Sequence, residues 1–286
     1  MGFLSAIGSC LSSIGSAIGG AIKAVGSALS SGLASAVGAL GSIGVKALGL
    51  FTKVSALVMG PLGPILGPIV VQIVLTLAAK VIENLAKERN MMDEDDRVDE
   101  VGYRMEKANE RKLDGPEKFD SFREYYEYLK SEIPVDERAR AEIRNNRLRY
   151  ITEGTAALSE GWAREINMEI PDDFLIIIGR CAINELEVKA IVAAYEALSK
   201  KEVSFGDYLT GKLSGVEEDA ITNALLVSYK NIMPEKTDDD VYGRIAEMIT
   251  LSKDDMKLAD YHKDIIDDIE KQGKEGKTAK DIEIRI

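Results

Sequence analysis

The first 82 residues of the chain contain no acidic side chain. This stretch holds four lysines (Lys23, Lys46, Lys53 and Lys80) and no arginine, and the first acid is Glu83. All 48 acidic residues follow it, where they outnumber 32 basic residues and leave that part with a net charge of -16. We therefore expect an N-terminal segment at 1–82, an acidic body at 83–270 and a polar linker with a short tail at 271–286. A division of the body near 134–171 stays open.

Large apolar side chains in the N-terminal segment follow the period of an α-helix. Units of about eleven residues repeat from Ser5 to Gly49, and eleven residues make three helical turns. The apolar positions step by three or four, which predicts one continuous apolar stripe along a helix. We interpret this stripe as lipid-facing; its residues are Ile7, Leu11, Ile14, Ile18, Ile22, Val25, Leu29 and Leu33.

A second stripe consists of small residues spaced by four. Such a ridge lets another helix approach closely, as in glycine-zipper packing. An isolated helix of this composition is poor in water, because each interior glycine costs about 1 kcal/mol relative to alanine. The pattern therefore favours tight packing in an oligomer, a bilayer or both. The stripe contains Gly8, Ser12, Ser16, Gly20, Ala24, Ala28, Gly32 and Ala36.

An uncharged run of 26 residues lies between Lys53 and Lys80. It is longer than the roughly 20 residues that span a bilayer. Three Gly-Pro pairs interrupt it, and residues before proline are disfavoured in helices. The run predicts a helical hairpin whose second arm begins at Pro68, suited to conditional insertion. The expected tip contains Gly60, Pro61, Gly63, Pro64, Gly67 and Pro68.

The part after Lys80 reads as soluble helices. Phe119, Tyr126 and Leu129 belong to an aromatic stripe typical of a core, and Pro171-Asp172-Asp173 opens another helix. Thr237 and Ser252 each precede an aspartate by three residues, which predicts two helix starts. The fold class is therefore all-α: a glycine-zipper and hairpin region followed by an acidic helical bundle.

Two charged clusters in the body have ordinary explanations. The run Asp93-Glu94-Asp95-Asp96 lacks the glycine and spacing of a calcium-binding EF-hand loop, so we interpret it as a solvated acidic surface. The arginines of residues 138–149 alternate with acids, which favours pairing inside the molecule. The tail alternates Ile282, Ile284 and Ile286 with charged residues and is suited to docking on a partner's sheet edge, with a frayed terminus as the alternative.

No constellation for catalysis is present in the sequence. It contains no phosphate-binding loop after a strand, no nucleophile elbow and only one histidine, His262, so we predict no enzyme, no cofactor and no metal site. The net charge of -12 argues against nucleic acid as a partner. Cys10 and Cys181 indicate free thiols, and a standard signal peptide is not expected. We therefore expect synthesis in a reducing cytoplasm, followed by action at a membrane, with a virion or secretion machine as a carrier.

These features predict a membrane-penetrating or pore-forming protein. Its partners would be a lipid bilayer, further copies of itself and a carrier or assembly protein that docks the C-terminal tail. The pattern resembles that of glycine-zipper pore formers, phage ejection proteins and the penetration proteins of non-enveloped viruses, and no motif selects among them. Two alternatives remain: a structural subunit of a virion, tail or secretion apparatus, and a permanently anchored membrane protein.

Overall fold

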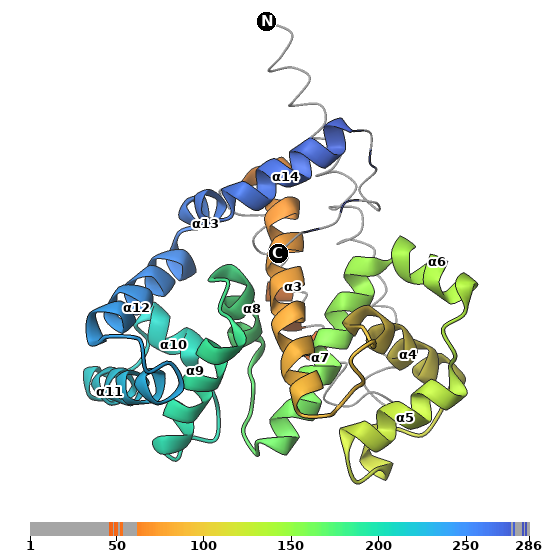
Figure 1. Ribbon diagram of the computed structural model, residues 1–286, viewed down its shortest axis with the longest axis horizontal. Helices are drawn as coiled ribbons and strands as arrows, with labels where there is room; N and C mark the ends of the chain where they lie inside the picture. The colour runs from red at the N-terminus through yellow and green to blue at the C-terminus, as the bar shows by residue number, and fades with distance from the viewer. Residues whose placement is uncertain are drawn as a thin grey trace, which may run out of the picture.

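The structure is all-helical throughout the residues it describes, as the sequence predicts (Figure 1). It is a computed structural model that describes residues 46–47, 49–50, 52–53, 62–275, 277, 282 and 284. Within these ranges the only β-type pairing is an isolated bridge between Glu169 and Glu202. The elements are α3 (Gly63–Glu88), α4 (Val98–Arg111), the 3-10 helix η1 (Pro116–Lys118), α5 (Phe122–Glu132), α6 (Glu137–Asn145), α7 (Arg147–Glu165), α8 (Asp172–Arg180), α9 (Glu185–Ala197), α10 (Phe205–Thr210), α11 (Gly215–Ile232), α12 (Asp238–Lys253), α13 (Asp255–Tyr261) and α14 (Lys263–Lys274).

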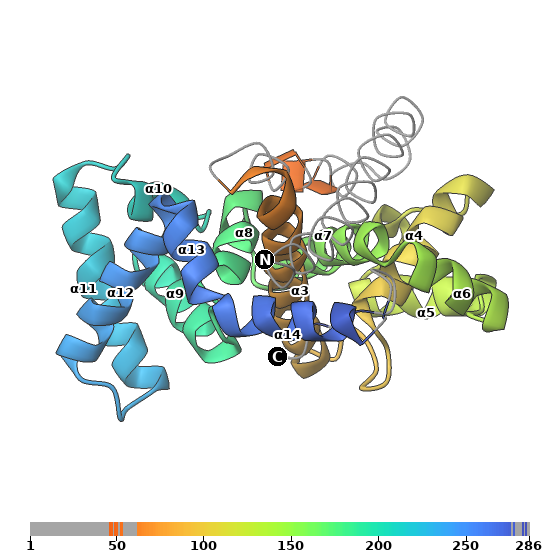
Figure 2. The ribbon, with the colours of Figure 1, turned by 90° about the horizontal axis from the view of Figure 1, so that it is seen from above.

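Helix α3 is the central element of the fold. In Figure 1 it stands between α4–α7 on one side and α8–α13 on the other, and α14 lies across it in Figures 1 and 2. Its main packing partners are α7 and α8. A helix that is apolar all round is stable in water only when protein covers every face. Accordingly, Ile69, Ile73 and Ile82 are buried in the hydrophobic core.

The start of α3 differs from the predicted hairpin. The helix begins at Gly63 and continues through Pro68, where the sequence predicts a new start. Pro68 lies in the second turn, so its missing N–H removes one hydrogen bond close to the helix end, where the cost is smallest. The expected boundary between residues 82 and 83 falls inside α3, with Ile82 and Leu85 in the same core. The described core therefore continues across the expected boundary into α3.

Helices α4 and α7 pack with their backbones in direct contact. A Cβ atom added to Gly154 would lie 1.9 Å from the carbonyl oxygen of Val98, and one added to Gly102 would lie 2.0 Å from the carbonyl oxygen of Tyr150. Only glycine permits backbones to meet at this distance. Tyr126 and Leu129 of α5 are buried beside this pair, which confirms the predicted aromatic stripe as core.

Two arginines, the buried Arg180 and the half-buried Arg244, attach α12 and α13 to α8 and α9. The Arg180 side chain donates hydrogen bonds to the carbonyl oxygen of Leu251 and, at 2.8 Å, to Asp255 Oδ1. Arg244 donates to the carbonyl oxygen of Cys181 and pairs with Glu187 at 2.8 Å. Charge-assisted bonds of this kind are strong and directional. The layer α12–α14 is thus fixed to the centre of the molecule.

The two predicted helix starts have different outcomes. Thr237 caps α12 in a capping box with Asp240, as expected. Ser252 is not a cap: it lies in the last turn of α12, and its hydroxyl donates to the carbonyl oxygen of Met248. Asp254 caps α13 in its place. A serine hydroxyl can bond to a preceding carbonyl inside a helix, so the motif alone does not fix the boundary.

The C-terminal tail contacts the body's own core. Ile282 is buried and belongs to the core, and Ile284 packs against it. Neither residue is in a strand. Ile282 is thus covered by this chain itself, whereas Ile284 remains partly exposed.

Candidate functional site

The site with the most unusual chemistry is the contact between the acid-free segment and the acidic body. We call the described residues Lys46, Ala47, Gly49, Leu50, Thr52 and Lys53 the docking segment; all are helical. Glu160 of α7 and Asp172 and Asp173 of α8 face it, and we call these three residues the acidic cradle. The cradle follows from local sequence, because the extended Pro171 starts α8 and leaves both aspartates in its first turn. The helix dipole favours acids there.

Lys46 makes the most buried of the polar contacts. Its Nζ lies 3.5 Å from Glu160 Oε2, and its side chain is 9% exposed. Burial lowers the pKa of Lys46, although the neighbouring Glu160 and Asp172 act in the opposite direction. Removing a lysine from water is costly unless a partner compensates it. The Lys46–Glu160 pair therefore sets the position of the segment more than it adds free energy.

Lys53 binds the other end of the cradle nearer to solvent. Its Nζ lies 3.1 Å from Asp173 Oδ1 and 3.8 Å from Asp172 Oδ2. Asp173 is half exposed, and such pairs typically contribute about 0–1 kcal/mol. Burial raises the pKa of Asp172, while Lys53 and Lys46 oppose this shift.

Apolar contact and close approach complete the site. Ala47 is buried, and Leu50 is fully buried in the common core. Full burial of a leucine side chain is worth about 1.5–3 kcal/mol. A Cβ atom at Gly49 would lie 2.0 Å from Asp172 Oδ2, so a larger residue there would displace the Asp172 side chain. The contact between the segment and the body thus combines buried apolar side chains with two lysines.

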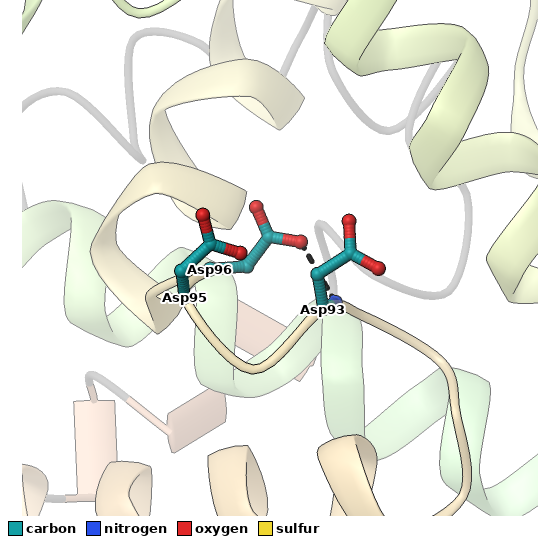
Figure 3. Close-up of side chains that lie close together, drawn as sticks. All are labelled: Asp93, Asp95 and Asp96. Carbon is teal, nitrogen blue, oxygen red and sulfur yellow. Dashed lines mark hydrogen bonds between the residues drawn. The ribbon is translucent and has the colours of Figure 1, made fainter.

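The acidic run at 93–96 forms a loop, and nearby cations bind two of its aspartates. Figure 3 shows Asp93, Asp95 and Asp96 close together, with the Asp93 N–H donating to Asp96 Oδ2 at 2.9 Å. Lys130 and Arg123 bind Asp93, and these hydrogen bonds lower the pKa of Asp93. Lys130 also contacts Asp96 at 3.2 Å. Asp93 and Asp96 are therefore engaged in ion pairs within the body, whereas Glu94 and Asp95 are exposed to solvent.

The predicted packing and lipid-facing stripes lie outside the described residues. This holds for every member of both stripes and for Gly60 and Pro61 of the expected tip. Gly63 and Pro64 form the first turn of α3, while Gly67 and Pro68 lie further inside it. Residues Leu66–Glu88 are long and apolar enough to cross a membrane, yet 78% of their most apolar window is buried in the protein. A core helix satisfies the same test, so this helix is weak evidence for a membrane span.

Sequence reasoning missed a buried charge cluster between α4 and α7. Arg149 of α7 contacts both Glu106 of α4 and Glu153 of its own helix. Burial raises the pKa of Glu106 to about 7 and that of Glu153 to about 8. The expected pairing of the arginines inside the molecule is met at Arg149 and at Arg147, which contacts Asp99. Glu153 is an i,i+4 neighbour on the same helix, whereas Glu106 lies about forty residues away in the sequence, so no local motif reveals that contact.

The remaining candidate groups are enclosed by protein. Cys181 is fully buried, and burial raises the pKa of its thiol to about 11. His262 is also buried; its Nε2 lies 2.9 Å from the carbonyl oxygen of Arg180, and burial lowers its pKa. Comparison with protein-family models, curated proteins and solved structures finds no match to this chain.

Proposed function

We propose that this is a membrane-penetrating protein whose N-terminal helices insert into a bilayer, as an oligomer, after release from a soluble or carrier-held state. One observation carries the proposal: the docking segment meets the body through lysines and apolar side chains, the two kinds of group that also bind an anionic membrane. A virion or secretion machine would bring the protein to its target.

The position of α3 limits which residues could insert into a bilayer. Ile69, Ile73 and Ile82 belong to the body's core, so their transfer to lipid would require the body to unfold. Insertion by a protein with a folded body therefore uses residues before α3. The apolar and small-residue stripes between Ile7 and Ala36 supply a lipid face and a packing face for this purpose.

Dye release from vesicles tests the proposal. The full chain should release dye from vesicles that contain phosphatidylserine. The double variant Gly20→Leu/Ala24→Leu adds bulk to the packing stripe and should reduce release about tenfold, which corresponds to ~1.4 kcal/mol. The control Ala17→Leu/Ala21→Leu adds one carbon less and places it beside both stripes, so it should release dye like the parent chain.

The opposite result would assign the protein to another class. Absence of release by the full chain, together with a large soluble oligomer in sedimentation, would contradict membrane penetration. The N-terminal stripes would then serve as the packing core of an assembly subunit. The burial of α3 favours this second candidate, because the longest apolar helix of the described chain is already used for internal packing.

A further inference from the structure

We propose that the acidic cradle is a releasable docking surface for the docking segment, and that an anionic lipid surface is the partner that displaces the cradle. This inference rests on the proposed function, because it names what opens the contact and what the segment then binds. It draws on the geometry at α7 and α8, and it does not depend on the residues before Lys46.

The outer ion pair of the contact is open to competition from other anions. Lys53 is 43% exposed and its partner Asp173 is 53% exposed, so water and other anions reach this pair. Lys46 and Leu50 lie deeper and depend on the segment remaining in place. Loss of the outer pair therefore removes an attachment that an approaching anionic surface can replace. Opening from the Lys53 end would expose Lys46 next.

Charge complementarity selects the competing partner. The segment presents lysines without acids, so an anionic surface attracts it. The cradle and the body behind it are acidic, so the same surface repels them. Separation of the segment from the body is thus favoured twice near anionic lipid, once by attraction and once by repulsion. A neutral vesicle offers neither effect.

The pKa of Asp172 argues against acid as the signal that opens this contact. The charged groups around it are Lys46 and Lys53 of the segment, Glu160 of α7, Asp172 and Asp173 of α8, and Glu169 in the connection between these helices. Burial raises the pKa of Asp172 above its ordinary value, so lowering the pH through the range of that carboxyl favours its buried position. Burial lowers the pKa of Lys46, and this shift acts in the opposite direction.

Trypsin cleavage after Lys46 and Lys53 reports release of the docking segment without relying on dye release. The full chain is mixed with vesicles of phosphatidylcholine alone or with an equal share of phosphatidylserine. The fragments are then followed by mass spectrometry, with cleavage after the exposed Lys112 as reference. We expect phosphatidylserine to accelerate cleavage after Lys46 about tenfold, equivalent to ~1.4 kcal/mol, and phosphatidylcholine alone to leave it unchanged.

Variants of the cradle provide the second arm. Asp172→Asn/Asp173→Asn should accelerate cleavage after Lys46 without vesicles, and Lys53→Gln should act in the same direction. The matched control Asp238→Asn/Asp239→Asn also removes two acids from the first turn of a helix, α12, and should leave the rate unchanged. Equal thermal unfolding temperatures of parent and variants would establish that the body is intact.

The outcomes separate the two proposals. Unchanged cleavage in the cradle variants, or no effect of phosphatidylserine, would overturn the releasable cradle even if the full chain released dye. Accelerated cleavage in both arms without dye release would support the cradle and contradict membrane penetration. Faster cleavage at pH 5 than at pH 7.5, without vesicles, would also overturn the inference, because it would make acid the opening signal.

Discussion

Lys46 and Glu153 are ionisable groups that the fold removes from water. They differ in which neighbouring charges compensate the cost of this desolvation. Lys46 is matched by one carboxylate, Glu160, at the junction with the docking segment. Glu153 shares Arg149 with Glu106, and Glu106 also lies 3.7 Å from Lys107 Nζ. The first arrangement keeps its charges through pairing, whereas the second favours proton uptake.

The Glu106–Arg149–Glu153 cluster should make stability depend on pH. The folded-state pKa of Glu153, about 8, lies above the ordinary 4.5, so the folded state retains a proton that the unfolded state loses. This contribution is complete below about pH 4.5 and is lost as the pH rises through about 8. We expect the urea midpoint to fall between pH 5.5 and pH 8.5. The variant Glu153→Gln should flatten this slope, and an unchanged slope would contradict the assignment.

Substitutions at Lys46 should separate burial from pairing. Lys46→Met keeps the aliphatic stem but removes the cation that faces Glu160, which is 22% exposed, so the free energy of unfolding should fall by at most about 3 kcal/mol. Lys46→Glu places a second acid against Glu160 and should detach the segment. Urea unfolding checks the first change, and trypsin cleavage after Lys53 checks the second. Equal losses of unfolding free energy in Lys46→Met and Lys46→Glu would show that the charge of the lysine is needed.

At the scale of elements, close helix contact depends on glycines that have no space for a side chain. Gly154→Ala would place a Cβ 1.9 Å from the backbone oxygen of Val98, which cannot rotate away. We expect a loss of at least ~2 kcal/mol in stability, as for an overpacked core. Gly243→Ala in α12 is the matched control, since no atom lies within 4 Å of its added Cβ. That change should stabilise the protein by about 0.5–1 kcal/mol. Thermal unfolding measures both.

Elements with local start signals could be predicted from the sequence, whereas the role of α3 could not. Pro171 and the following acids predict α8, and Thr237 predicts α12, because these signals act within one helical turn. An apolar run has the same appearance whether lipid or protein covers it. The acidic cradle was also not predictable, since Lys46 meets Glu160 across more than one hundred residues.

At the scale of the whole molecule, α3 determines how much of the N-terminal part can be deleted while the rest still folds. A chain that begins at Leu62 retains the whole of α3 and should keep its helical content, although it loses Leu50 from the core. A chain that begins at Lys80 lacks Ile69, Ile73 and Val74, and should lose cooperative unfolding. Circular dichroism during heating distinguishes the two. A sharp transition in the shorter chain would contradict the central role of α3.

The central place of α3 has a consequence for synthesis on the ribosome. Its apolar faces leave the exit tunnel well before the helices that cover them, because α7 ends at Glu165 and α8 at Arg180. At translation rates of about 5–20 residues per second, the interval between α3 and α8 lasts on the order of 5–20 s. During that time the nascent chain carries an uncovered helix with the composition of a membrane span. Until α7 and α8 have been synthesised, the apolar faces of α3 are therefore available to chaperones.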